Sequence, residues 1–170
     1  MNESPERLVS GAARCPRGRL RLQVRDAAGA VVQERRARNI VLRQGAAVVA
    51  NLFAAQAGAV GIDTIRVGFG REAATAESTA LQPPDDATIP ATALASAVVP
   101  TDFRIVTDRP DAVQVIVTSV FRPTIELTDV TEAGLLAGDR LYNQVVFEPV
   151  TLRPGQDVTF FWEIDFPFGR

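Results

Sequence analysis

The chain has neither histidine nor lysine, and all 18 of its basic residues are arginines. Without histidine there is no side chain whose unperturbed pKa lies near neutrality, no Ser-His or Cys-His nucleophile pair, and no imidazole metal ligand. Without lysine there is neither a Schiff base nor a Walker-type phosphate loop. An enzyme would have to work with carboxylates, Tyr142, hydroxyl groups or arginines, as a glycosidase does. We therefore expect no enzyme, no cofactor and no metal site.

Cysteine is almost as scarce, because Cys15 is the only one. A single cysteine excludes an intrachain disulfide and a zinc site built from several thiolates. No apolar run approaches the roughly 18 residues that a membrane helix needs. The amino-terminal segment MNESPERLVSGAARCPRGR lacks the apolar centre of a secretory signal. These absences predict a protein that folds in a cytoplasm and does not enter a membrane.

The charges are unevenly distributed along the chain. Residues 1–43 contain ten arginines and four acids, a net charge of +6, whereas residues 44–170 contain eight arginines and sixteen acids, a net charge of −8. One interpretation is that an arginine-rich segment, including Arg19, Arg21, Arg35 and Arg36, docks on an acidic surface of a neighbouring copy or of another partner. The other is that both surfaces are solvated in a monomer. Nucleic acid binding is not expected, because the basic segment has no aromatic residues that would stack on bases.

Most of the chain shows the patterns of short β-strands. Residues 1–17 have no hydrophobic period and are expected to be a flexible or partner-ordered arm before a single domain at 18–170. The segment GRLRLQVRD alternates leucine and valine with polar residues and precedes the turn Asp26–Gly29, which predicts a hairpin with AVVQERRA. Further strands are predicted in IDTIRVGFG, DFRIVT, AVQVIVTSVF, TIELTDVTEAGLL, RLYNQVVFEPVTL and DVTFFWEIDF.

Only one substantial helix is predicted, in RQGAAVVANLFAAQAG at residues 43–58, with Val48, Val49, Leu52 and Phe53 at helical spacing and Gly58 as a C-cap. We expect it to pack on a sheet. The loop REAATAESTALQPPDDATIPATA is too long for a simple turn, and loops of that length are usually functional or wrap a neighbour. Many strands and one helix predict a mainly β fold, an antiparallel two-sheet β-sandwich of jelly-roll type with an inserted helix.

The order of several motifs resembles a known family. These motifs are Asn39-Ile-Val-Leu, a glycine-led helix at Gly45–Phe53, IRVGFG with a loop ending in STALQ, VTEAGLLAGDRLYNQVVF, and VTLRPGQDVTFFWEIDF. In this order, over residues 39–166, the chain is similar to small bacteriophage virion proteins of the tail fibre, collar or baseplate type, which also occur in phage-derived injection particles. The resemblance implies a structural component of a virion or phage-like particle, assembled in the bacterial cytoplasm as a symmetric homo-oligomer that contacts other particle proteins.

Two other functions are compatible with the residues. A receptor- or glycan-binding module of a tail fibre would need exposed aromatic residues on loops, whereas the aromatic residues here lie mostly in predicted strands. A carboxylate-only glycoside hydrolase would need two acids at a defined separation in a cleft. Glu132, at the centre of VTEAGLL, is the acid in question, with Asp129 or Glu163 as candidate second carboxylates.

Glu132 and the nearby Gly134 are also compatible with a purely structural role. A glutamate just before Ala-Gly is expected to bond exposed backbone amides or an arginine such as Arg140, while Gly134 allows a kink or the close approach of another backbone. We expect this structural role. Asn143 and Trp162 are likewise expected to be a strand polar group and a core residue.

The last strand carries the residue that points most directly to assembly. Val158, Phe160, Trp162, Ile164 and Phe166 alternate with polar residues and are expected to face the core. Phe161 lies on the opposite face among Thr159, Glu163 and Asp165. It is either an ordinary exposed residue or the anchor of a subunit contact.

Overall fold

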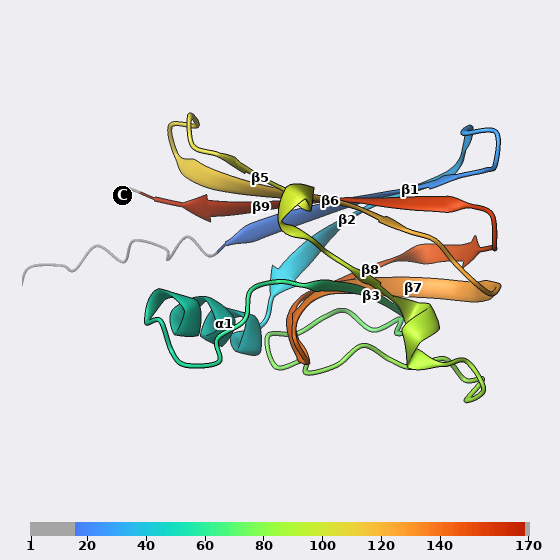
Figure 1. Cartoon of the computed structure of the whole chain (residues 1–170), viewed down its shortest axis with the longest axis horizontal. Coiled ribbons are helices and arrows are strands. Elements are labelled where there is room, and N and C mark those ends of the chain that lie inside the picture. Colours follow the sequence, from blue (N-terminus) through green and yellow to red (C-terminus); the bar gives the residue numbers. More distant parts are fainter. Residues whose placement is uncertain (1–15, 169–170) are drawn as a thin grey trace, which may run out of the picture.

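The computed structural model describes residues 16–168, which form nine strands, one α-helix and two short 3₁₀ turns (Figure 1). The elements follow in the order β1 (Arg17–Arg25), β2 (Val31–Val41), α1 (Arg43–Phe53), β3 (Thr64–Gly68), η1 (Ala91–Leu94), β4 (Ala95–Ala97), η2 (Pro100–Asp102), β5 (Phe103–Val106), β6 (Ala112–Phe121), β7 (Leu127–Ala137), β8 (Arg140–Leu152) and β9 (Asp157–Pro167).

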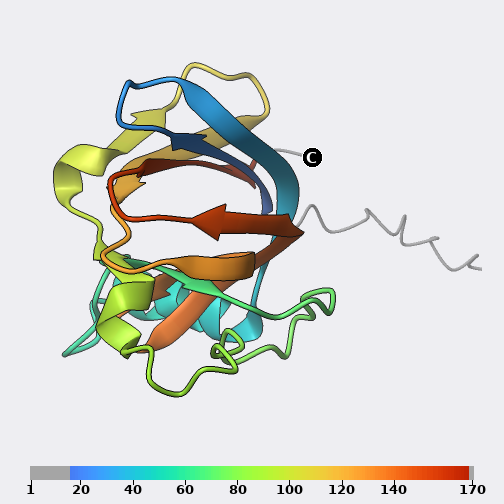
Figure 2. The ribbon, with the colours of Figure 1, turned by 90° about the vertical axis from the view of Figure 1, so that its right-hand side faces the viewer.

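All nine strands belong to one antiparallel sheet, in the order β4-β3-β7-β8-β2-β1-β9-β6-β5. The sheet curls into a half-barrel, so that β1, β9, β6 and β5 lie opposite β8, β7 and β3 (Figure 2). The mainly β class, the antiparallel pairing and the single α-helix are therefore confirmed. Division into two separate sheets is not confirmed, because β2 pairs with β1 along its length and with β8 at Ile40 and Val41.

The inner face of the curled sheet forms the main hydrophobic core. In β9 the side chains of Val158, Phe160 and Trp162 are completely buried, as the alternation predicts, and the rings of Phe160 and Trp162 lie 6.4 Å apart. Leu20, Leu22 and Val24 of β1 reach the same core. The predicted β1–β2 hairpin is also confirmed, and Gly29 occupies its turn with a φ of +82° that favours glycine.

Before Ile40, β2 is not paired with β8. Side chains of β2 form the hydrogen bonds between the two strands there, in place of backbone pairs. Arg35 donates from Nε to the carbonyl of Glu148 (3.1 Å) and from Nη2 to that of Pro149 (2.8 Å). Gln33 donates to the carbonyl of Thr151 (3.2 Å). These bonds satisfy carbonyl groups of β8 that have no strand neighbour there. Arg35 thus holds the two halves of the half-barrel together along a seam, which we define as β2 from Gln33 to Arg35 facing β8.

The helix α1 packs on β8 mainly through its first turns. A Cβ atom on Gly45 would lie 2.0 Å from the carbonyl oxygen of Tyr142, so only glycine permits this approach. Val48 is buried, but Leu52 and Phe53 are 46% and 93% exposed. The helix packs on the sheet as expected, but through its amino-terminal half. The predicted C-cap at Gly58 is wrong, because the helix ends at Phe53 with Ala54 as its C-cap.

The predicted arm at residues 1–17 lies almost wholly outside the described residues, although Arg17 already belongs to β1. From Arg17 onwards the strands surround one main core, and a smaller cluster of Leu42, Leu136 and Leu141 lies on the outer face of β7 and β8. The α-helix found within residues 16–168 has 11 residues, too few to cross a membrane.

Candidate assembly surface

Three of the four arginines singled out in the sequence come together on the outer face of the sheet. Arg19 and Arg21 project from β1, and Arg36 lies opposite Arg21 on β2. Arg35 is directly opposite Leu22 and so belongs to the other face of β2, where it closes the seam. Arg35 and Arg36 lie on different faces of β2, because successive residues of a strand point to opposite faces.

The hairpin places like charges directly opposite each other. Arg19 pairs with Arg38, and Arg21 pairs with Arg36. Directly opposed side chains in an antiparallel pair have Cβ atoms only about 5 Å apart, so two cations in such a pair destabilise it. The position of Arg38 on this face was not predicted from the sequence, because β2 has no hydrophobic alternation that would show which of its residues share a face. These two arginine pairs are electrostatically unfavourable in the isolated chain.

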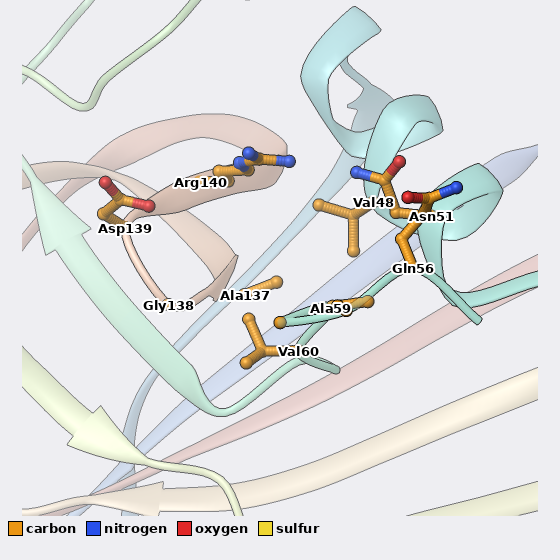
Figure 3. A pocket seen from close by; sticks show the side chains of 11 residues that line it. Val48, Asn51, Gln56, Ala59, Val60, Ala137, Gly138, Asp139 and Arg140 are labelled. Carbon is orange, nitrogen blue, oxygen red and sulfur yellow. The ribbon is translucent and has the colours of Figure 1, made fainter. Parts of the chain in front are cut away.

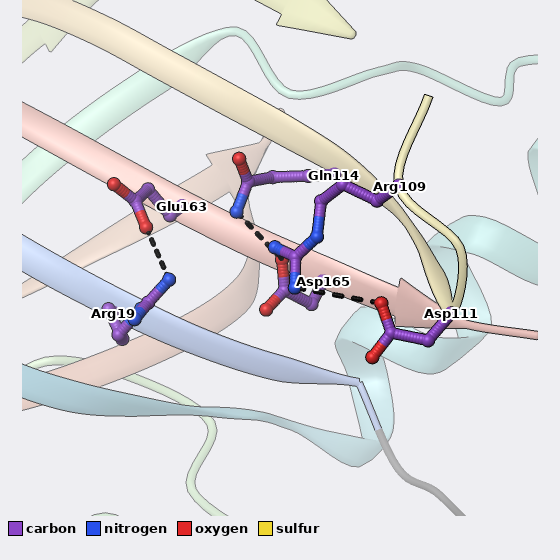
Figure 4. Close-up of polar contacts among 6 residues, drawn as sticks. All are labelled: Arg19, Arg109, Asp111, Gln114, Glu163 and Asp165. Carbon is purple, nitrogen blue, oxygen red and sulfur yellow. Dashed lines mark hydrogen bonds and ion pairs between the residues drawn. The ribbon is translucent and has the colours of Figure 1, made fainter. Parts of the chain in front are cut away.

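Acidic side chains on the same face relieve part of the repulsion between the arginines. Figure 4 shows two of these acids, Glu163 and Asp165, with their partners. Arg19 donates to Glu163 on β9 (2.7 Å), and Asp165 accepts from Arg109 (3.0 Å) and Gln114 (2.8 Å). Glu34 accepts bonds from Gln23 and Arg36, and these bonds lower the pKa of its carboxyl group. The Arg19–Glu163 and Arg36–Glu34 pairs are largely exposed, and such surface pairs contribute little to stability.

Positive charge remains in excess on this surface, which we call the arginine face. By register it carries seven arginines against four acids, an excess of three positive charges. Among residues 16–168, no carboxylate lies within 4.0 Å of Arg17, Arg38 or Arg104. The charged residues of the arginine face are Arg17, Arg19, Arg21, Arg25, Arg36, Arg38, Arg104, Glu34, Asp157, Glu163 and Asp165.

Phe161 lies in the middle of the arginine face, on the side of β9 opposite the core. It pairs with Arg21 on one side and Thr118 on the other. The guanidinium of Arg21 covers its ring, with Cζ 4.2 Å from the ring centroid, a cation–π contact. Phe161 and the arginines around it line a shallow hollow of about 410 Å³. The predicted outward orientation of Phe161 is confirmed, and its role in assembly stays a prediction.

Glu132 is completely buried and holds the long loop after β3 against the sheet. Its Oε1 accepts from the backbone amides of Gly70 (3.0 Å) and Gln82 (2.5 Å), and its Oε2 accepts from Nε2 of Gln144 (2.5 Å). A Cβ atom on Gly70 would lie 2.9 Å from Oε1, so the carboxylate fits because Gly70 has no side chain. The expected bonding to backbone amides is confirmed, and Arg140 takes no part in it.

Gly134 lies two residues further along the same outer face. The space of its missing side chain is filled by Leu141 and by the Asn143 carbonyl, and Leu81 of the loop lies 3.5 Å from the Cβ position. Glycine is required there because no side chain fits between these groups. The segments VGFG, TALQ and TEAG, far apart in sequence, thus meet at one place. The long loop is bound to its own chain from Gly70 to Gln82.

The interior roles expected for Asn143 and Trp162 are also observed. Asn143 is buried, and its Oδ1 accepts from the amide of Leu135 (3.0 Å) next to an irregularity in the β7–β8 pairing. Trp162 is completely buried in the core.

Neither of the two acids considered as a second carboxylate lies beside Glu132, although Glu132 and the exposed Glu72 border the same hollow of about 390 Å³. Asp129 is exposed and contacts Arg71 (3.6 Å), and Glu163 lies on the arginine face. Within residues 16–168 no three potential metal ligands of the His, Cys, Asp or Glu type come together. The carboxylate of Glu132 accepts three N–H bonds from its own chain, two at Oε1 and one at Oε2.

Two further hollows lie away from the arginine face. One, of about 330 Å³, lies between the end of α1 and the β7–β8 turn; Asn51 and Gln56 border one side and Asp139 and Arg140 the other (Figure 3). The other, of about 360 Å³, lies beside the long loop and is lined by Asp85, Asp86, Glu126 and Asp129, with Arg71 as its one arginine. We call these four acids the acidic loop end.

No protein-family model, curated protein or solved structure matches this chain.

Proposed function

We propose that this protein is a non-enzymatic structural subunit that assembles with copies of itself through the arginine face. The observation that carries the proposal is the register that sets Arg19 opposite Arg38 and Arg21 opposite Arg36, around the half-buried ring of Phe161. An anionic partner would turn these unfavourable contacts into favourable ones, and an aromatic residue at the centre of a polar surface is typical of an interface anchor.

We further propose that the assembly is part of a phage or phage-like particle, in its tail, collar or baseplate region, formed in the bacterial cytoplasm together with other virion proteins. The support is the order of motifs from residue 39 to residue 166 and the contact that three of them make around Glu132. In this proposal the two halves of the curled sheet act as the two layers of a jelly-roll-like sandwich. The receptor- or glycan-binding alternative has less support, because Trp162 and Tyr142, the side chains best suited to stack on sugars, are buried.

Two neighbouring substitutions test self-assembly. Phe161→Ala removes a surface anchor and is expected to shift the protein to smaller species in light scattering after size exclusion, with little change in thermal stability. Trp162→Ala opens a cavity in the core and is expected to cost about 3 to 5 kcal/mol of stability. Raised salt should also weaken the wild-type assembly, because exposed charges are screened beyond about 10 Å at 0.1 M salt. A wild-type chain that stays monomeric at every concentration, or a Phe161→Ala oligomer of unchanged size, would count against the proposal.

A further inference from the structure

The arginine face and the acidic loop end are different surfaces of the molecule, and a hollow of about 400 Å³ that both Arg36 and Arg71 border lies between them. In Figures 1 and 2, which share a vertical axis, β1, β9 and β5 lie in the upper part and the loop between β3 and η1 lies in the lower part. The arginine face belongs to the outer side of the upper strands.

The acidic loop end complements the arginine face in charge. Four acids and one arginine line its hollow, and Glu126 also pairs with Arg153 (3.1 Å), so that four acids face two arginines and two negative charges remain in excess. Asp85 and Asp86 are exposed, and within the described residues neither forms an ion pair. Asp86 accepts bonds from the amide and hydroxyl groups of Thr88, which lower the pKa of its carboxyl group. The hollow offers carboxylates to cationic side chains that enter it.

Other occupants of the arginine face fit less well. Residues 1–15 carry two acids and two arginines, so they add no net charge that would balance the face. A nucleic acid would meet a single aromatic residue, Phe161, although single-strand binding surfaces usually present several to stack on successive bases. The whole chain also has a net charge of −2, which repels a polyanion at long range.

We propose that the arginine face of one copy binds the acidic loop end of a second copy. This rests on the proposed self-assembly and specifies its geometry. The two copies contribute different surfaces, so one contact leaves an arginine face and an acidic loop end free. Where these bind further copies the contact is head-to-tail and gives a ring or a filament, and where they bind each other it gives a two-fold dimer. Arg38 and Arg104, which have no carboxylate partner among residues 16–168, would gain one in the contact.

Charge reversal at each surface provides the test. The double variant Arg36→Glu, Arg38→Glu changes only the arginine face, and the double variant Asp85→Arg, Glu126→Arg changes only the acidic loop end. All four residues are exposed, so both variants are expected to keep the wild-type circular dichroism and melting temperature. Each should weaken self-association about tenfold or more, because like charges then face each other.

The decisive measurement is light scattering of an equimolar mixture of the two variants. Each variant keeps one intact surface, and the two reversed surfaces are again opposite in charge, so the mixture is expected to form complexes that contain both variants in equal numbers and that neither variant forms alone. Glu72→Gln, a change at an exposed acid outside both surfaces, is the control and should assemble as the wild type does.

Each of the following outcomes argues against the proposed contact between the arginine face and the acidic loop end. If the wild type assembles and the acidic-loop variant assembles equally well, self-assembly stands and this contact is wrong. The contact is also wrong if both variants fail to assemble and their mixture forms no complex that contains both. A short single-stranded DNA that binds the wild type but not the arginine-face variant, while the acidic-loop variant assembles normally, would assign the face to a polyanion. A wild-type protein that stays monomeric would show that the proposed function, self-assembly, is itself wrong.

Discussion

Tyr142 is the only tyrosine of the chain, and it is buried in the core with no hydrogen-bond partner for its hydroxyl among residues 16–168. Burial raises the pKa of the phenol from 10.0 to about 12. The fold therefore favours the neutral phenol, because the phenolate would be buried without compensation. The stability that depends on the neutral form is complete below pH 10 and is lost as the pH rises from about 10 to about 12.

A spectrophotometric titration should show this shift directly, since only one tyrosine contributes. We expect the phenolate absorbance of the native protein to appear with a midpoint near pH 12, accompanied by loss of the fold, and that of the chain in denaturant to appear near pH 10. Tyr142→Phe removes the signal and should make stability less sensitive to alkaline pH. A native midpoint close to that of the denatured chain would show that the ring is accessible to solvent.

The orientation of a side chain can be predicted from the sequence in β9 but not in β2. The orientations of Trp162 and Phe161 follow from the strict alternation of β9, which has one clearly apolar face. Arg35 and Arg36 could not be separated in this way, because VVQERRARNIV alternates neither in size nor in polarity. Their faces depend on the register with β1, which tertiary pairing sets and which the local pattern does not contain.

At the scale of elements, the long loop illustrates how one buried carboxylate positions many residues. Glu132 holds the loop at Gly70 and at Gln82, and the loop also reaches the start of α1, where the amide of Arg43 donates to the carbonyl of Ala76 (2.9 Å). The sequence predicted β3 before this loop and the backbone contact of Glu132, but not the short strand β4 that follows the loop. It did not predict that the loop returns to its own sheet, since Gly70, Gln82 and Glu132 are far apart in sequence.

Glu132→Gln should loosen this loop without changing the sheet order. An amide side chain has one oxygen where the carboxylate has two, so at least one N–H donor loses a charge-assisted bond, a loss of about 1 to 3 kcal/mol. Hydrogen exchange is expected to accelerate at the amides of Gly70 and Gln82. Glu72→Gln, the same change at an exposed position of the loop, should stay within about 0.5 kcal/mol of the wild type. If a glycan substrate were found whose cleavage collapses in folded Glu132→Gln, the structural role of this residue would be wrong.

For the molecule as a whole, the half-barrel depends on a narrow connection between its halves. Only Ile40 and Val41 of β2 form strand pairs with β8, and Arg35 and Gln33 continue the junction with side-chain bonds. Arg35 is therefore a structural residue for both halves, whereas the adjacent Arg36 belongs to the arginine face. The mainly β class was predictable from strand patterns, but the curling of all strands into one sheet was not, because it depends on the few residues that join β2 to β8.

Substitution of the two arginines by methionine should separate these roles. Arg35→Met keeps most of the apolar stem but leaves the carbonyls of Glu148 and Pro149 without donors, so we expect a loss of about 1 to 3 kcal/mol in chemical denaturation followed by Trp162 fluorescence. Arg36→Met removes only an exposed pair with Glu34 and should cost less than about 1 kcal/mol while weakening self-association. Equal losses of stability in the two variants would contradict the assignment of Arg35 to the seam.

The pairing of β1 with β9 has a consequence for how the chain reaches this structure. These are the first and last strands of the described residues, and their register runs from Arg17 with Asp165 to Arg25 with Asp157. The hairpins β1–β2 and β7–β8 are local and form early, whereas contacts between distant segments form slowly because a long loop must close first. During synthesis, β1 therefore exposes an unpaired edge and half of the core stays open until β9 has left the ribosome.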